Sequence, residues 1–288
     1  MNSQILLSHP FGNSNVKNTA LAFSEENILT EYWTAISWDE NNWLNSVLPA
    51  TIKKELMRRN YPNVSKKYIK HFPRYEIARL IARRLGAKQI AGREGGLISA
   101  LNCHVKLDEK VGKRVLALKN LTAVYSYDHC ALNTFEAASK RGIKRIYDLP
   151  TGYWKLMQRI ALEEIELQPN WRATAPSLNF PNEIYHRKDE ELLMANHVVV
   201  ASQFTKNSLQ LLPEMKASTS IIPYGAPQPI QVRHINSSRD KKLRVLYVGN
   251  LGVLKGLPYL LSAIEKLNGA VELTLIGSRI GESATLNA

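Results

Sequence analysis

The segment 245–267, "VLYVGNLGVLKGLPYLLSAIEKL", carries the residues whose types and spacing best suit phosphate binding. Gly249, Asn250 and Gly256 lie in a loop between an apolar run and a helical pattern, and Lys255 is the loop's only cation. First-turn amides and the positive end of a helix favour a phosphate, and a lysine adds a mobile charge. The G-x-G-x-x-G and Walker spacings are absent. The pattern therefore leaves two readings open, a phosphate-binding turn and an ordinary strand-to-helix turn.

A second candidate for phosphate binding is "SHPFGNSNVKN" (8–18), which follows a predicted strand at 4–9. Gly12 and Asn13 can adopt positive φ and expose backbone amides. Open α/β sheets bind ligands beyond the carboxyl ends of their strands. A plain turn is the alternative.

Candidate acid–base groups follow two further predicted strands, 121–127 and 144–149. Asp128 and His129 come directly after the first of these, and Asp148 lies at the end of the second. All three can reach the crevice beyond the strand ends, although Asp128 is also well placed to cap the next helix, which is the more frequent role of such an aspartate. The ends of the last two strands of this part of the chain supply predicted crevice-lining residues: Ser202, Tyr224 and Gly225.

Metal ions and cofactors are not expected. The seven histidines show no metal-ligand spacing, and the chain has only two cysteines, Cys103 and Cys130. A disulfide framework is therefore also excluded.

The elements that must position these groups alternate between short apolar strands and longer helical patterns. This alternation predicts an α/β fold with a doubly wound, Rossmann-like parallel sheet. Residues 226–242 are polar and contain proline, which indicates a linker, and a second β-α-β pattern follows it. Expected strands lie at 4–9, 29–38, 121–127, 144–149, 197–202, 220–225, 243–249 and 271–277, and expected helices at 16–23, 131–142, 153–167, 182–196, 204–212 and 257–267.

Positive charge is concentrated in one segment of the chain. Residues 51–88 hold twelve Lys and Arg against Glu55 and Glu76, which is 12 − 2 = +10 of the total of +13. We expect this segment to be mostly helical, with Ile77, Leu80, Ile81 and Leu85 on one face of a helix that Gly86 ends. Such a segment attracts nucleic acid, anionic lipid or a phosphorylated substrate, or is simply a solvated face.

Other features of the sequence reduce the number of partners expected for residues 51–88. No helix-turn-helix, zinc or aromatic RNA-binding signature is present, so nucleic acid is not expected as a partner. No apolar run approaches the roughly 20 residues that span a bilayer, and the N-terminus lacks a signal-peptide pattern. We expect a cytoplasmic protein, with peripheral association of residues 51–88 with the anionic inner membrane face as a hypothesis.

Taken in order, three segments resemble the family-four retaining glycosyltransferases of GT-B architecture. "ANHVVVASQFTKNSL", "SIIPYGAP" and "LRVLYVGNLGVLKGLPYLLSAIEKL…VELTLIGS" follow one another over residues 195–277, and "SHPFGNSNVKNTALAF", "AVYSYDHCALNTFEAA" and "IYDLPTGYW" look like a bacterial subgroup of that family. The resemblance implies an acceptor-side domain over 1–225, a linker over 226–242 and the beginning of a nucleotide-sugar-binding domain over 243–288.

The resemblance also implies roles for single residues. Lys255 matches a lysine that contacts the donor diphosphate, and Gly12 matches a glycine loop near the donor phosphate. Asp128, His129 and Asp148 lie in segments that contact acceptor and sugar. The family's arginine after the strand glycine is Asn250 here, and no pair of glutamates two helical turns apart follows Gly277, so we expect an incomplete, truncated donor domain.

The activity implied is transfer of a sugar from a nucleotide-sugar to a hydroxyl, with retention and without a metal, to a glycan or lipid-linked acceptor. The nucleotide-sugar is a substrate, so no cofactor is expected. The alternative is a non-catalytic acceptor-binding module that needs a second chain for the donor half, because the expected donor domain is incomplete.

Overall fold

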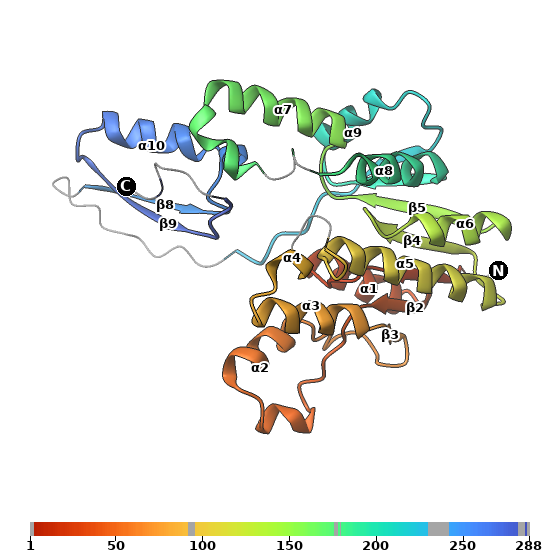
Figure 1. Ribbon diagram of the computed structural model, residues 1–288. Helices are drawn as coiled ribbons and strands as arrows, with labels where there is room; N and C mark the ends of the chain where they lie inside the picture. The colour runs from red at the N-terminus through yellow and green to blue at the C-terminus, as the bar shows by residue number, and fades with distance from the viewer. Residues whose placement is uncertain are drawn as a thin grey trace. The chain divides into compact units, whose positions relative to one another are not determined.

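A computed structural model describes residues 3–91, 96–175, 178, 180–229, 242–281 and 286. The chain divides into two compact units (Figure 1). The first comprises Met1–Tyr153 and Pro181–Gly225, and the second comprises Trp154–Phe180 and Ala226–Ala288. Most of the predicted linker, residues 230–241, lies outside the described residues.

The first unit is built on a seven-stranded sheet in the order β3-β2-β1-β4-β5-β6-β7, and every pair of neighbours is parallel. This confirms the predicted α/β class with a Rossmann-like parallel sheet. Strand order reverses between β1 and β4, which is where such sheets open a crevice at their carboxyl ends. The strands are β1 Ile5–Ser8, β2 Leu29–Thr34, β3 Ile69–His71, β4 Ala123–Tyr127, β5 Lys144–Leu149, β6 His197–Val200 and β7 Ser218–Ile221.

Helices cover both faces of this sheet. The crossover β1–α1–β2 runs toward one edge and β4–α6–β5 toward the other, and right-handed connections then place α1 and α6 on opposite faces. The helix α1 buries Val16 and Ala20 against the sheet, while α5 packs along α6, and α6 along α8. The helices of this unit are α1 Ser14–Glu25, α2 Ala50–Met57, α3 Arg74–Arg84, α4 Lys88–Ala91, α5 Ala100–Ala117, α6 Leu132–Lys140, α8 Asn182–Met194 and α9 Gln203–Ser208, with short 3-10 turns η1 Trp43–Ser46 and η4 Leu209–Leu211.

The second unit holds the predicted second β-α-β pattern. Strands β8 (Leu243–Val248) and β9 (Val271–Ile276) pair in parallel, and η5 (Val253–Lys255) and α10 (Leu257–Lys266) connect them. Trp171 and Ile165 pack with Leu257 in its core, so α7 (Trp154–Leu167) and η2 (Pro169–Thr174) belong to this unit. The sequence predicted the helix 153–167 but placed it in the first domain.

The prediction of a mostly helical basic segment was only partly right, and one long helix after it was missed. Residues 51–88 are not helical throughout, because β3 interrupts them as the edge strand of the sheet. The helix α5, 18 residues long, was not predicted at all. It is amphipathic, with buried apolar residues at every fourth position, at Cys103, Leu107, Val111 and Val115.

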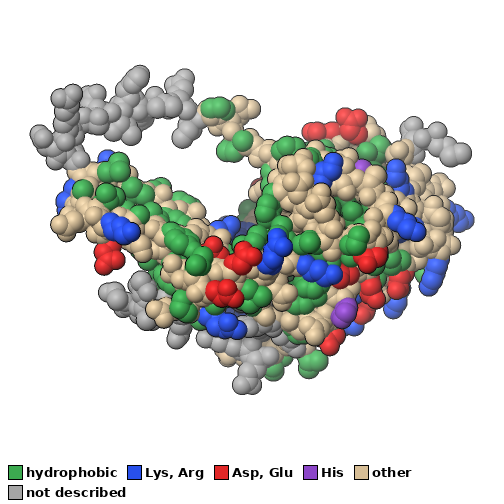
Figure 2. Space-filling view, turned by 90° about the horizontal axis from the view of Figure 1, so that it is seen from above, with side chains coloured by type: hydrophobic (Ala, Val, Ile, Leu, Met, Phe, Trp, Pro, Cys, Tyr) green, Lys and Arg blue, Asp and Glu red, His purple; other side chains and the backbone are tan. Residues whose placement is uncertain are grey.

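No helix among the described residues is long and apolar enough to cross a bilayer. On the face that Figure 2 shows, Lys and Arg side chains are interspersed with Asp and Glu side chains. The concentration of positive charge is read from the sequence, where residues 51–88 carry +10 of the net +13.

Candidate active site

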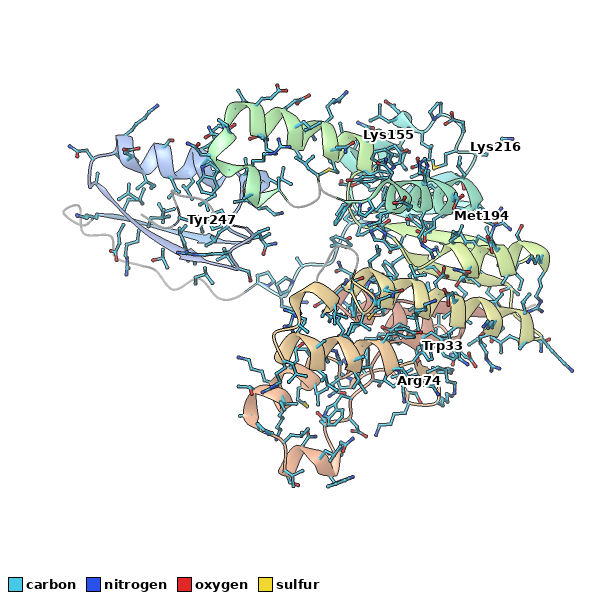
Figure 3. The ribbon with its side chains drawn as sticks, viewed as in Figure 1. Trp33, Arg74, Lys155, Met194, Lys216 and Tyr247 are labelled. Carbon is cyan, nitrogen blue, oxygen red and sulfur yellow. The ribbon has the colours of Figure 1, made fainter. Side chains whose placement is uncertain are left out.

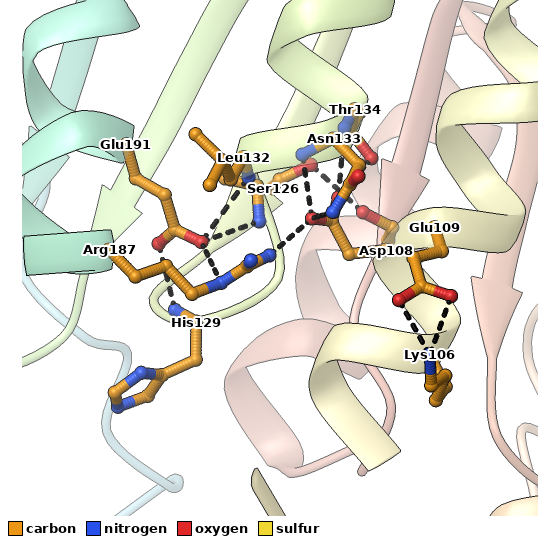
Figure 4. Close-up of polar contacts among 12 residues, drawn as sticks. Lys106, Asp108, Glu109, Ser126, His129, Leu132, Asn133, Thr134, Arg187 and Glu191 are labelled. Carbon is orange, nitrogen blue, oxygen red and sulfur yellow. Dashed lines mark hydrogen bonds and ion pairs between the residues drawn. The ribbon is translucent and has the colours of Figure 1, made fainter. Parts of the chain in front are cut away.

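Several buried polar side chains meet at the start of α6, a few residues after the end of β4 (Figure 4). A carboxylate oxygen of Glu191 accepts hydrogen bonds from the backbone N–H groups of Ala131 and Leu132, at 3.1 and 3.3 Å, and its other oxygen accepts one from the N–H of His129 at 2.9 Å. Asp108 accepts from the N–H groups of the next two residues, Asn133 and Thr134, at 2.8 and 2.9 Å. Two carboxylates from other helices thus satisfy the amides that a helix start leaves unpaired.

The two carboxylates share one cation. Arg187 of α8 places Nε 3.2 Å from Glu191 and also pairs with Asp108. Both carboxylates are fully buried, and buried charges persist where they are paired and hydrogen-bonded. The amide end of α6 is therefore occupied by the protein's own carboxyl groups, and burial raises the pKa of Glu191 to about 8 despite the neighbouring Arg187.

Asp128 does not cap α6, contrary to the structural alternative that the sequence left open. The cap residue is Ala131, and no side chain of its own closes the helix. Asp128 instead accepts hydrogen bonds from Lys188 Nζ and Tyr147 Oη, both at 2.8 Å, and its Oδ2 lies 3.6 Å from His129 Nε2. Burial alone would raise the pKa of Asp128, but His129, Lys188 and Tyr147 together hold it well below its usual value. Asp128 is therefore an anion at neutral pH.

Three histidines meet beside Asp128. The His104 ring lies 5.8 Å from that of His9 and 6.0 Å from that of His129, both edge to face. Burial lowers the pKa of His9 and of His129 to about 4, and that of His104 falls well below its usual value for the same reason. The three imidazoles are thus neutral at pH 7, and Nδ1 of His104 and of His129 has no hydrogen-bond partner. Among the described residues, no group of three or more His, Cys, Asp or Glu side chains is arranged to hold a metal ion.

Asp148 lines a separate cavity of about 340 Å³ on the α1 side of the sheet. It lies next to last in β5, in register with Tyr127 of β4 and Val199 of β6. Tyr125 Oη donates a hydrogen bond to its Oδ2 at 2.7 Å. Burial raises the pKa of Asp148 to about 6, although hydrogen bonds from Tyr125 and Tyr127 act to lower it. A carboxyl group with this pKa can accept or release a proton near neutral pH.

The rest of the cavity combines apolar walls with a few polar groups, which is typical of small-molecule sites. Of the predicted crevice-lining residues, Tyr224 and Gly225 line it together with Asp148. Ser202 does not, because its hydroxyl caps α9 by accepting from Thr205 N at 3.2 Å. The remaining lining residues are Asn15, Asn18, Thr19, Ala22, Phe23, Tyr125, Val199, Val200, Ala201, Ile222 and Pro223.

The glycine loop after β1 is closed by protein side chains. A Cβ on Gly12 would overlap the hydroxyl of Tyr61, which also contacts Tyr32 and Thr34 at 3.1 Å. Gly12 does not adopt the positive φ that the sequence suggested. A glycine is needed at position 12 because Tyr61 lies too close to leave room for a side chain. Asn13 is the cap of α1 and accepts from Val16 N at 3.0 Å.

In the second unit, the loop between β8 and α10 forms a compact turn. Gly256 has φ +71°, which favours glycine at the junction of η5 and α10. The amides of Lys255 and Gly256 are bonded within the turn, and the N–H of Val253 donates to Thr174 Oγ1 at 3.0 Å. Lys255 is exposed at the end of η5. Gly249 and Asn250 follow β8, where the Asn250 carbonyl accepts from Tyr247 Oη at 2.8 Å.

No protein-family model and no curated protein sequence matches the chain. Solved structures do resemble it. Phytolacca americana UGT2 complexed with UDP-2fluoro-glucose and pterostilbene superposes with a TM-score of 0.50 at 11% identity, over 96% of this chain and 72% of that one. This likeness shows a shared fold.

Two other neighbours superpose less well. A UDP-glucosyltransferase from Polygonum tinctorium gives a TM-score of 0.43 at 10% identity, over 96% of this chain and 73% of its own. Arabidopsis thaliana UGT89C1 complexed with UDP-L-rhamnose gives 0.42 at 12% identity, over 96% and 70%.

Several residues that build the site were not predicted from the sequence. His104 and Asp108 lie on α5, which was missed as an element. Arg187, Lys188 and Glu191 lie on α8, which was predicted without any role for its charged side chains. The available signal was the i, i+4 spacing of Arg187 and Glu191, which places both on one face of a helix.

Proposed function

We propose that this protein transfers a glycosyl group from a nucleotide-sugar to a hydroxyl of a glycan or a lipid-linked acceptor. The reaction would retain the anomeric configuration and need no metal ion. The observation that carries the proposal is the Asp148 cavity, in which a carboxyl group with a pKa raised to about 6 lies at the carboxyl end of a Rossmann-like sheet. The shared fold with Phytolacca americana UGT2, which was solved with a UDP-sugar, supports it.

The chemistry assigns different work to the two units. In the transfer, a bond forms between the acceptor oxygen and the anomeric carbon while the bond from that carbon to the diphosphate breaks. Asp148 would accept a hydrogen bond from the acceptor hydroxyl, orient its oxygen toward the face of the anomeric carbon that the diphosphate leaves, and take up the hydroxyl proton as the new bond forms. The departing diphosphate carries the developing negative charge, and Lys255 with the start of α10 would stabilise it.

Nucleotide binding by the intact chain tests the donor half of the proposal. We expect calorimetry to detect one of UDP, GDP or ADP, and Lys255→Ala to weaken that binding about tenfold through loss of one charge-assisted contact. Lys266→Ala is the matched control, because Lys266 is an exposed lysine in the last turn of α10. Binding that both variants weaken equally would contradict a specific role for Lys255.

The acceptor half is tested separately. Asp148→Asn keeps an oxygen that accepts from Tyr125 but removes the carboxylate. We expect it to leave nucleotide binding unchanged and to lower the transfer rate at least a hundredfold. The anomeric configuration of the product, read by NMR early in the reaction, tests retention.

A specific observation favours one second candidate. The turn that contains Lys255 already bonds its amides internally and to Thr174, which leaves fewer groups for a phosphate. If no nucleotide diphosphate binds, the chain is better explained as an acceptor-binding module that needs a second chain for the donor half.

A further inference from the structure

The helix α3 buries charge and exposes apolar side chains, the reverse of a usual surface helix. Glu76 is 0% exposed and Arg79 is 9% exposed. Ile77 and Ile81 are 46% and 54% exposed, and Leu85, directly after the last helical residue, is 79% exposed. Three of the four residues of the predicted apolar face therefore point away from the core, and the fourth, Leu80, is half-buried.

Ion pairs explain why the charged face is inside. Arg79 Nε and Nη2 donate to the two oxygens of Glu76, both at 2.7 Å. Arg59 Nη2 donates to Glu76 at 2.7 Å, and Arg59 Nη1 pairs with Glu55 at 2.9 Å. A buried carboxylate with three guanidinium contacts has its charge satisfied. The inward orientation of α3 is therefore set by polar pairing.

The same pairs leave the outward charge of this region positive. Glu55 and Glu76 are the only acidic residues between 51 and 88, and both are engaged by arginine. The exposed basic side chains have no remaining acidic neighbour in that segment to balance them. They are Lys53, Lys54 and Arg58 in and just after α2, and Arg74 (labelled in Figure 3), Arg83 and Arg84 in α3.

Apolar and basic side chains occur on the same face of α3. Ile77, Ile81 and Leu85 follow one another at four-residue spacing and form what we call the α3 stripe. Arg74 and Arg84 lie three residues before Ile77 and three after Ile81, which is the spacing of neighbours on a helix surface. Arg84 also reaches Thr51 of α2 at 3.5 Å, so the basic residues of α2 lie close to the stripe.

We propose that the α3 stripe docks this protein on the surface of an anionic lipid bilayer. The stripe would enter the boundary between headgroups and acyl chains, and the surrounding lysines and arginines would meet the anionic headgroups. The inference does not depend on the proposed glycosyl transfer, because it uses none of the residues assigned to that site.

The positive charge around the α3 stripe favours an anionic bilayer over a second copy of the chain, and the apolar stripe favours a bilayer over nucleic acid. A second copy of the chain would bring an equally positive surface against the first, which opposes association. Nucleic acid would use the positive charge, but its phosphates gain nothing from exposed isoleucine and leucine. An anionic bilayer offers both an apolar phase and complementary charge.

Vesicle co-sedimentation of the full chain tests the proposal. We expect binding to vesicles of phosphatidylcholine with 30% phosphatidylglycerol, set here as roughly the charge of an anionic membrane, and little binding to phosphatidylcholine alone. The triple variant Ile77→Ser, Ile81→Ser, Leu85→Ser should bind at least about tenfold more weakly. Arg74→Gln with Arg84→Gln should also weaken binding, and salt should reduce it.

A matched control is available in the same chain. Leu162, Leu116 and Leu167 are 46%, 54% and 67% exposed, on helices other than α3. Changing these three to serine should leave vesicle binding unchanged. Circular dichroism and light scattering report whether each variant keeps its fold and its mass. Equal loss in both triple variants would overturn the proposal, as would a dimer that the stripe variant dissolves in the absence of any vesicle binding.

Discussion

The first unit buries carboxylates and guanidinium groups beneath its helices, whereas the described core of the second unit is almost entirely apolar. Glu31, Glu76, Asp108, Asp148 and Glu191 are buried in the first unit, and Thr174 is the only buried polar residue among the described residues of the second. The second unit instead gathers Trp171, Val253 and Leu257 with neighbouring leucines.

Two helices make this contrast sharp. In α10 the apolar positions Leu257, Leu260 and Leu261 pack into the core of the second unit. In α3 the apolar positions face outward because Glu76 and Arg79 are held inside. Periodicity thus finds an apolar face, but the partners available to the charged face decide which side is buried.

Removing the buried anion of α3 should have the largest effect. Glu76→Ala leaves Arg59 and Arg79, whose side chains are 13% and 10% exposed, without their carboxylate. We expect a loss of about 3–5 kcal/mol in the free energy of unfolding, measured by urea denaturation. Glu76→Gln should recover only part of it, since it keeps an acceptor but not the charge. A change under about 1 kcal/mol would mean that polar pairing does not hold α3 in place.

The matching test in α10 truncates an apolar side chain. Leu257 is 0% exposed, and Leu257→Ala should destabilise the second unit by about 2–4 kcal/mol through lost burial and a cavity. Hydrogen exchange, read separately over β8 and β9, gives the effect on that unit. Tyr259→Ala is the control on the same helix, because Tyr259 is 43% exposed.

Acid should weaken the first unit through its histidines. His129 has its pKa lowered to about 4 by burial, so the unfolded chain binds more protons below pH 6.5. The stabilising contribution of neutral His129 is therefore present above about pH 6.5 and is lost as pH falls toward 4. From pH 7 to pH 5, the free energy of unfolding of wild type should fall by about 2 kcal/mol more than that of His129→Asn. Asparagine is chosen because it tolerates the φ of +69° at this position.

Asp148 should make the free energy of unfolding fall as pH rises, which is opposite to the effect of His129 and smaller. Its pKa is raised to about 6, so the folded chain binds the extra proton between about pH 4 and 6, and stability is lost as pH rises through that range. From pH 5 to pH 7, the free energy of unfolding of wild type should fall by about 1 kcal/mol more than that of Asp148→Asn. Urea denaturation at the two pH values gives the difference. If wild type instead lost more stability than Asp148→Asn between pH 7 and pH 5, the pKa of Asp148 would not be raised in the folded protein.

The smallest effect is expected on the outward face of α3. Ile81→Ser removes an isoleucine that is 54% exposed and should change the free energy of unfolding by less than about 0.5 kcal/mol. A loss above about 2 kcal/mol would show that the α3 stripe is packed in the free protein, and would remove the contrast with α10.

Apolar patterns predicted most of the fold and little of the candidate site. Strands such as β4 and β5 were placed within about two residues, because buried parallel strands are continuous apolar runs. The site depends on pairs far apart in sequence, such as Glu191 with Ala131 and Asp108 with Thr134. No local pattern reports such pairs, and α5 was missed because it carries many charged residues among its apolar positions.

The capping of α6 by two distant carboxylates bears on how the chain folds. The first amides of α6 find their acceptors only after Asp108, about 25 positions earlier, and Glu191, about 60 positions later, have reached them. The start of α6 therefore cannot be completed by its own segment during synthesis, and closing such loops slows folding. Its amides should then exchange with solvent only in openings that separate α6 from both α5 and α8.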